Sequence, residues 1–153
     1  MQGTSNEKTD GKSIELATFF VGSAFCGLDI LNIQEINKLM EMTHVPQTPD
    51  YVKGILNLRG QIVTIIDLRK KLGLAATGSK QQSRNNIIVK SKDEYIGFLT
   101  DGISDVLRIN LNEVEPPPAN IGGIQGIFFK GVYKTEDKLI GLLDIDKVLK
   151  VDE

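Results

Sequence analysis

The sequence contains one cysteine, one histidine and no tryptophan, and these scarcities exclude several classes of protein. A single cysteine, Cys26, cannot form an internal disulfide, which is typical of proteins in a reducing compartment. With His44 as the only histidine, a histidine-rich metal site is impossible, and a Cys–His nucleophile pair could only join these two residues. Cys26 lies in an apolar stretch, where a free thiol usually packs as a small hydrophobic side chain. We therefore expect no catalytic residue, no metal site and no cofactor.

The sequence also lacks a membrane span, a secretion signal and an excess of positive charge. No apolar run approaches the roughly 20 residues needed to cross a bilayer. Residues 1–13 are polar and offer little apolar surface to bury, so we expect a disordered N-terminal tail and no signal peptide. The net charge of −2 argues against a nucleic-acid partner. Together these features predict a cytoplasmic protein without direct membrane insertion.

What the sequence does contain is a series of short apolar segments separated by turn residues, the pattern of a mainly β protein. Hairpin turns are expected at three places: Gly60, the pair Lys92 and Asp93, and the pair Glu136 and Asp137. Short helical turns are expected after three residues whose side chains can cap a helix: Thr48, Asp67 and either Asp144 or Asp146.

The two halves of the chain resemble each other. Gly27 and Gly97 lie 70 residues apart in similar surroundings, Gly54 and Gly126 lie 72 apart, and Asp67 and its counterpart Asp144 lie 77 apart. Matches in the same order predict an internal duplication, although short β segments can also resemble one another by chance. We expect a first barrel at about 14–74 plus a C-terminal segment, a linker at 75–83 and a second barrel at about 84–145, within one domain spanning 14–153.

Residues 54–69 carry a long ungapped motif, Gly-Ile-x-Asn-Leu-Arg-Gly-x-Ile-Val-x-x-Ile-Asp-Leu-Arg. With residues 29–36, this motif resembles the CheW family of bacterial chemotaxis coupling proteins, and looser agreement extends the resemblance over roughly residues 14–151. The resemblance implies two packed five-stranded SH3-like β-barrels with a few short helices. It also implies a non-enzymatic adaptor that links methyl-accepting chemoreceptors to the histidine kinase CheA, recruited from the cytoplasm to receptor arrays at the inner membrane.

The resemblance further implies two binding surfaces. The hairpin tip of the chemoreceptor is expected in the groove between the barrels, beside the Asn-Leu-Arg-Gly segment. The residues expected to bind it are Glu35, Arg59, Ile33, Asn57, Gly60 and Ile62. The regulatory, CheW-like domain of CheA is expected on the other side of the first barrel. The residues expected to bind the kinase are Leu39, Met40, Met42 and Val45.

The residue types at these positions leave alternatives open. The planar guanidinium of Arg59 can hold carbonyl or carboxylate groups of a partner, but it could also merely pair with Glu35 and tie two strands together. Met40 and Met42 could contact a protein partner or fill the core. The counterpart of Arg59 in the second half is expected near residues 129–131, where there is no arginine. The alternative function is an SH3-like protein-binding module in another two-component or motility pathway.

Overall fold

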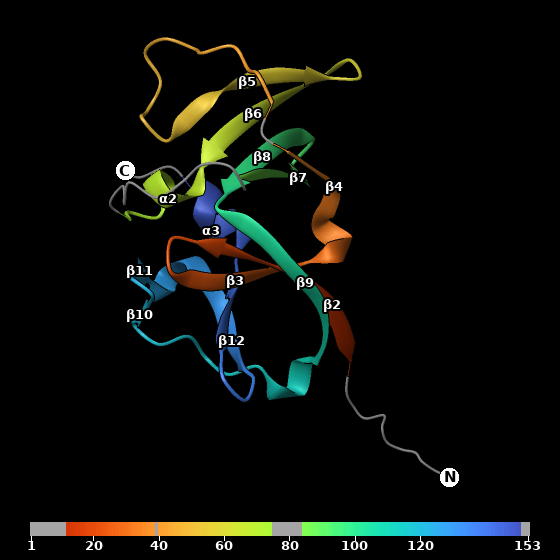
Figure 1. Ribbon diagram of the computed structural model, residues 1–153, viewed down its shortest axis with the longest axis vertical. Coiled ribbons are helices and arrows are strands. Elements are labelled where there is room, and N and C mark those ends of the chain that lie inside the picture. The colour runs from red at the N-terminus through yellow and green to blue at the C-terminus, as the bar shows by residue number, and fades with distance from the viewer. Residues whose placement is uncertain (1–11, 39, 75–83, 151–153) are drawn as a thin grey trace.

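The computed structural model describes residues 12–38, 40–74 and 84–150, and most of this chain is β-strand (Figure 1). The linker expected at 75–83, most of the expected tail and Leu39 lie outside the described residues. The end of the expected tail is corrected, because Ser13 already belongs to a strand.

Two five-stranded sheets lie one above the other in Figure 1. The first sheet has the order β12 (Phe129–Lys134), β13 (Leu139–Leu143), β3 (Ala24–Asp29), β2 (Ser13–Val21) and β9 (Gly102–Asn110). The second sheet has the order β5 (Val52–Leu58), β6 (Gln61–Asp67), β8 (Glu94–Thr100), β7 (Asn85–Ser91) and β4 (Ile33–Lys38). The expected mainly β fold, with two five-stranded units and a few short helices, is confirmed.

Both sheets use the same sequence of pairings. Read in the orders just given, the neighbours pair antiparallel, parallel, antiparallel and antiparallel in the first sheet. The second sheet repeats this pattern. A repeated pairing pattern is stronger support for the expected duplication than short sequence matches are, because the second and fourth pairings of each sheet join strands that are not consecutive in the chain.

Each half of the chain contributes its first two strands to the sheet completed by the other half. β2 and β3 join β9, β12 and β13, whereas β7 and β8 join β4, β5 and β6. The expected barrel boundaries are therefore wrong: the second sheet is the continuous stretch 33–100, and the first sheet combines 13–29 with 102–143. The sequence pattern shows where strands lie, but it does not show which distant strand completes the hydrogen bonding of each edge.

The strand register of the two sheets shows which positions of the two repeats correspond. Gly27 lies opposite Leu142 and Gly97 lies opposite Ile65, in agreement with the offsets of 70 and 77 residues. Gly54, however, also lies opposite Ile65, whereas the glycine opposite Leu142 is Gly131. The counterpart of Gly54 is therefore Gly131 and not Gly126.

The same register corrects the counterpart of Arg59. Leu58 lies opposite Gln61 across the β5–β6 turn. In the first sheet, the backbone N–H of Thr135 donates to the carbonyl of Lys138 across the β12–β13 turn, at 2.9 Å. The position equivalent to Arg59 is then Glu136, so the two repeats carry opposite charges at the same turn.

The expected turns and caps are confirmed with one exception. Asp67 caps α2 (Leu68–Lys71) by accepting from the N–H of Arg69, and Asp144 caps α3 (Ile145–Leu149). Thr48 starts no helix, because its hydroxyl donates to the carbonyl of Val45 and β5 begins soon afterwards. The remaining short elements are η1 (Ile30–Asn32), η2 (Leu111–Glu113), β10 (Asn120–Ile121), β11 (Ile124–Gln125) and η3 (Gly126–Phe128).

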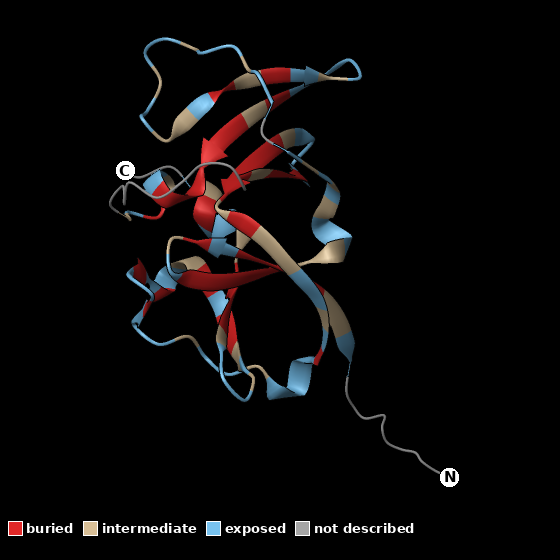
Figure 2. Ribbon diagram, in the orientation of Figure 1, coloured by how far each residue is buried: buried red, intermediate tan, exposed pale blue. Residues whose placement is uncertain are grey.

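The main hydrophobic core lies between the sheets, where buried residues concentrate in Figure 2. Phe19 of the first sheet and Phe98 of the second are both fully buried in it, together with Leu68 of α2 and Val148 of α3. Each sheet also encloses a smaller apolar cluster of its own. Because both sheets and both short helices share one core, the sheets are held in a fixed arrangement.

A buried ion network crosses from the second sheet to the first. Arg84 Nη2 lies 3.1 Å from Asp67 Oδ2, and Arg84 Nε lies 3.8 Å from Asp101 Oδ1. Asp101 Oδ2 lies 3.7 Å from Arg69 Nε and also accepts from the backbone N–H of Gly22, in the β2–β3 turn, at 2.6 Å. The carboxylate of Asp101 therefore joins the two sheets.

Candidate partner-binding site

Arg59 and Glu35 connect the two outer strands of the second sheet. Glu35 lies in β4 and Arg59 in the β5–β6 turn, so they come from opposite edges of the sheet. The guanidinium Nη2 of Arg59 donates to Glu35 Oε1. The Arg59 side chain nevertheless stays 73% exposed, against 26% for Glu35. The pair therefore ties strands together and leaves the guanidinium accessible to a partner.

The turn that carries Arg59 is fixed by its neighbours. Arg59 and Gly60 have φ angles of 52° and 86°, and two consecutive residues with positive φ are the signature of a type I′ hairpin turn. A β-carbon at Gly60 would meet no atom within 4 Å, so glycine serves the backbone conformation here. The side chain of Asn57 accepts from the N–H of Gly60 at 2.8 Å and closes the turn. Asn57 and Gly60 thus set the position of Arg59.

Glu35 has a second donor in Asn37, whose side-chain amide donates to Oε2. These contacts lower the pKa of Glu35 below its ordinary value. The hydrogen bond from Arg59 is the largest cause, and the one from Asn37 is the second. Desolvation acts in the opposite direction, and the positive charge of Arg59 lowers the pKa by a still smaller amount.

The lowered pKa gives an expected pH dependence. Because the folded-state pKa of Glu35 lies below the unfolded value, its stabilising effect is present above the unfolded pKa and is lost as pH falls through the folded pKa. We expect the Glu35 carboxyl carbon, followed by NMR, to titrate at lower pH in the wild type than in an Arg59→Ala variant. Arg108→Ala, which removes an exposed cation elsewhere, is the matched control. Equal midpoints in all three proteins would contradict the assignment.

A hollow of about 230 Å³ lies beside the ion pair. Its lining combines apolar and polar side chains from all five strands of the second sheet and the β5–β6 turn: Leu58, Val63, Ile88 and Tyr95, with Gln34, Glu35, Arg59 and Gln61. The expected groove between the two barrels is therefore not where Arg59 lies. The sequence could not predict this hollow. Hydrophobic alternation shows which side chains of one strand lie on the same face, but it does not show which strands pack together around one hollow.

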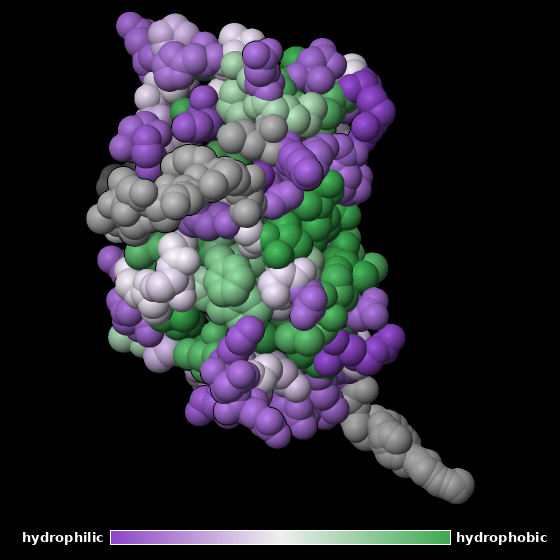
Figure 3. All heavy atoms as spheres, viewed as in Figure 1, coloured by the Kyte–Doolittle hydropathy of each residue, from purple (hydrophilic) through white to green (hydrophobic). Residues whose placement is uncertain are grey.

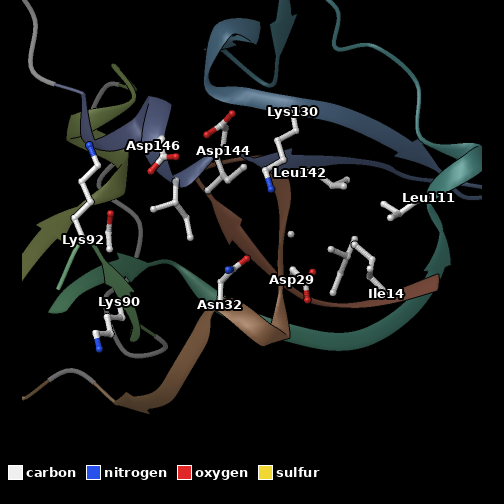
Figure 4. Close-up of a pocket in the computed structure, with 15 residues that line it drawn as sticks. Ile14, Asp29, Asn32, Lys90, Lys92, Leu111, Lys130, Leu142, Asp144 and Asp146 are labelled. Atoms are coloured by element: carbon white, nitrogen blue, oxygen red, sulfur yellow. The ribbon is translucent and has the colours of Figure 1, made fainter. Parts of the chain in front are cut away.

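A different hollow, of about 480 Å³, lies between the sheets (Figure 4). Ile14, Leu142 and Lys130 line it from the first sheet, and Lys90 and Lys92 line it from the second. Arg59 is not part of its lining. The inter-sheet groove and the Arg59 surface are thus separate features.

Ile33 and Ile62, predicted as apolar neighbours of Arg59, do not line its hollow. Ile33 packs against the main core, because a bulge in β4 lets Ile33 and Glu35 face different sides of the sheet. Ile62 is 57% exposed and points away from the hollow, since the next residue in β6, Val63, points into it.

The residues predicted to bind the kinase divide into different environments. Met42 packs against the small core of the second sheet, whereas Met40 is exposed. Two hydrogen bonds of 2.8 Å between Thr43 and Ile55 attach this segment to the edge strand β5. Val45 is partly buried. Core filling therefore describes Met42, and Met40 is the methionine available to a partner.

The two predicted surfaces adjoin each other. Met40 and Asn57 line the same hollow of about 280 Å³ along β5. Asn57 also closes the turn that carries Arg59. A partner at Met40 and a partner at Arg59 would therefore contact neighbouring parts of one hairpin.

Exposed apolar side chains outside the predicted set form another feature that the sequence analysis missed. Leu31 of η1 is 84% exposed, Val106 of β9 is 58% exposed and Ile36 of β4 is 40% exposed. Figure 3 shows apolar surface over the side of the molecule where β2 and β9 lie. Strand periodicity alone could not distinguish these side chains from core residues.

Within residues 12–38, 40–74 and 84–150, no three His, Cys, Asp or Glu side chains are grouped so as to hold a metal ion. None of the helices in this part of the chain has the length and apolar character of a membrane span. Cys26 is buried, and this burial raises the pKa of its thiol to about 12, so the thiol stays protonated at neutral pH.

The comparisons with known proteins all point to one family. The sequence model of the CheW-like domain matches residues 15–153. The chain is 32% identical over 148 residues to chemotaxis protein CheW of Helicobacter pylori, covering 97% of this chain and 88% of that protein. It is 33% identical over 139 residues to chemotaxis protein CheW of Thermotoga maritima, covering 91% and 89%. The crystal structure of the scaffolding protein TtCheW from Thermoanaerobacter tengcongensis superposes with a TM-score of 0.83 at 30% identity, covering 97% of this chain and 96% of that one.

Proposed function

The chain belongs to the CheW-like domain family, and on this basis we propose that it couples methyl-accepting chemoreceptors to the histidine kinase CheA. Its relatives are named as chemotaxis proteins, and the similar solved structure is that of a scaffolding protein. The coarse role is accordingly that of a non-enzymatic chemotaxis adaptor. In the specific role that we propose, the protein acts in the cytoplasm and is recruited to receptor arrays at the inner membrane.

The observation that carries the proposal is the state of Arg59, which is oriented and exposed at once. Its guanidinium is hydrogen-bonded to Glu35 yet mostly open to solvent, and a hollow lined by apolar and polar side chains lies directly beside it. A side chain that is already oriented loses less freedom on binding, and arginine is enriched among the residues that dominate interfaces.

The chemistry of this surface suits the tip of a receptor hairpin. Such a tip is a pair of helices that offers apolar side chains together with carbonyl and carboxylate groups. The hollow can accept apolar groups against Leu58, Val63 and Ile88, which line it, and Arg59 can hold a carboxylate with two donors. Because Ile62 faces away from the hollow, it would contact the tip only outside the hollow, on the outer face of β6.

The kinase surface is proposed along the segment that covers β5. Met40 is exposed there, Val45 is partly buried, and the backbone of this segment is held by pairing with Ile55. Because Met40 and Asn57 line one hollow, receptor and kinase would meet at adjacent sides of the β5–β6 hairpin.

Reconstitution tests the proposal. The protein is mixed with a receptor cytoplasmic fragment and CheA from the same organism, and co-sedimentation and CheA autophosphorylation are measured. We expect it to sediment with both partners and to change the autophosphorylation rate, whereas an Arg59→Glu variant loses the receptor fragment. Absence of both effects with the wild-type protein would reject the coupling role for these partners and favour the alternative of a binding module in another pathway.

A further inference from the structure

We propose that Asn37 is a positioning residue of the Arg59 surface, which strengthens partner binding without contacting the partner. Asn37 holds one oxygen of the Glu35 carboxylate while Arg59 holds the other. The inference rests on the proposed function in one respect: the partner whose affinity it affects is the receptor tip.

The geometry places Asn37 behind the ion pair. Asn37 follows Glu35 by two residues in β4, so both side chains lie on the same face of the strand, toward the interior of the second sheet. Across the β4–β7 pairing, Asn37 lies opposite Asn86, which is fully buried. Asn37 itself is partly buried and does not line the hollow at Arg59. A partner seated at Arg59 would therefore not contact it.

Holding both carboxylate oxygens restricts Glu35 to one orientation, and this in turn orients Arg59. Without the amide of Asn37, the Glu35 carboxylate can rotate, and the exposed guanidinium follows it. A partner then has to order these side chains when it binds. Freezing one such side chain on binding corresponds to an affinity loss of roughly 2- to 10-fold.

Asn37 is a poor choice for stability alone, which is the second reason to assign it a role in the site. Within the described part of the chain, Asn37 Oδ1 and both polar atoms of the Asn86 amide are buried without a hydrogen-bond partner. Buried polar atoms without partners destabilise a fold, and the neighbouring interior positions, such as Ile88 and Leu99, are apolar. Local departures from good packing of this kind are expected at functional sites.

Other ionisable groups near Glu35 do not take over the task of Asn37. The hollow contains the phenol of Tyr95 from β8, and Lys90 of β7 lies over the Tyr95 ring at 5.8 Å. Among the described residues, the side-chain hydrogen bonds that lower the pKa of Glu35 come from Arg59 and Asn37 alone. Removing the Asn37 amide should therefore be visible directly at Glu35.

An Asn37→Leu variant tests the inference, because leucine has a similar size and no donor. Receptor-fragment affinity, melting temperature and the NMR titration of the Glu35 carboxyl are measured for the wild type, N37L, R59A and the N37L/R59A double variant. We expect N37L to bind the fragment 2- to 10-fold more weakly, to melt no lower than the wild type, and to raise the titration midpoint of Glu35. A residue with a merely structural role would change the melting temperature and leave the affinity for the receptor fragment unchanged.

The outcomes separate the inference from the proposed function. If R59A weakens binding and N37L binds as the wild type does, the role of Asn37 is wrong while the receptor surface stands. If N37L weakens R59A further by the same factor, Asn37 does not act through Arg59 and the inference is again wrong. If R59A leaves binding unchanged, the receptor surface itself fails, and an unshifted Glu35 midpoint in N37L then also rejects the positioning role.

Discussion

Replacement of Arg84 by methionine is expected to lower the free energy of unfolding by about 3–5 kcal/mol, because it leaves the buried Asp67 carboxylate without its cation. The side chains of Arg84 and Asp67 are only 3% and 4% exposed, and Asp101 is shared between Arg84 and Arg69. Methionine keeps much of the volume of the arginine stem, so the loss would reflect the charge and not a cavity.

Thermal or urea unfolding measures this loss. For a chain of this size, the change corresponds to a fall in melting temperature of roughly 6–20 °C. The matched control is Arg108→Met, which removes an ion pair whose side chains are 68% and 41% exposed and should cost less than about 1 kcal/mol. If the two variants melt at the same temperature, the buried network does not hold the sheets together as described.

Replacement of Arg59 by alanine is expected to weaken receptor binding at least tenfold while the melting temperature changes little. Arginine side chains at the centre of an interface commonly account for such losses. The effect on stability is small because the pair with Glu35 is a surface pair, with the arginine 73% exposed.

An Arg59→Lys variant separates charge from geometry. Lysine keeps the positive charge but cannot hold a carboxylate with two parallel donors, so it should restore only part of the affinity. Binding isotherms of the wild type, R59A and R59K against one receptor fragment measure the difference. Full affinity in R59K would mean that charge alone is recognised, and a large loss of stability in R59A with unchanged affinity would reduce Arg59 to a structural residue.

Local features of the fold could be read from the sequence because they depend on neighbouring residues. Gly60, the pair Lys92 and Asp93, and the caps Asp67 and Asp144 were all predicted from turn and cap chemistry. The grouping of strands could not be read in this way. The parallel pairing of β3 with β13 joins residues more than 100 positions apart, and nothing in the β3 segment specifies that partner.

The candidate site likewise contains residues that the sequence indicated and residues that it could not indicate. The Asn-Leu-Arg-Gly motif indicated Arg59, and Glu35 came with it through the family resemblance, so their contact was anticipated as one alternative. The roles of Tyr95 and Ile88 in the hollow could not be predicted, because they arrive from strands of the other half of the chain. A bulge in β4 turned Ile33 toward the core, and such a local irregularity leaves little trace in the hydrophobic pattern.

The exchange of strands between the halves has a consequence for the order in which the protein folds during synthesis. All strands of the second sheet lie in residues 33–100, so this sheet can be completed while the ribosome is still translating the rest. The hairpin of β2 and β3 emerges first but finds its remaining partners last, since β13 ends at Leu143. At typical elongation rates this hairpin waits roughly 5–20 s with unpaired edges. These two strands are thus made before the second sheet and protected after it, and the nascent chain depends on β9, β12 and β13 to cover them.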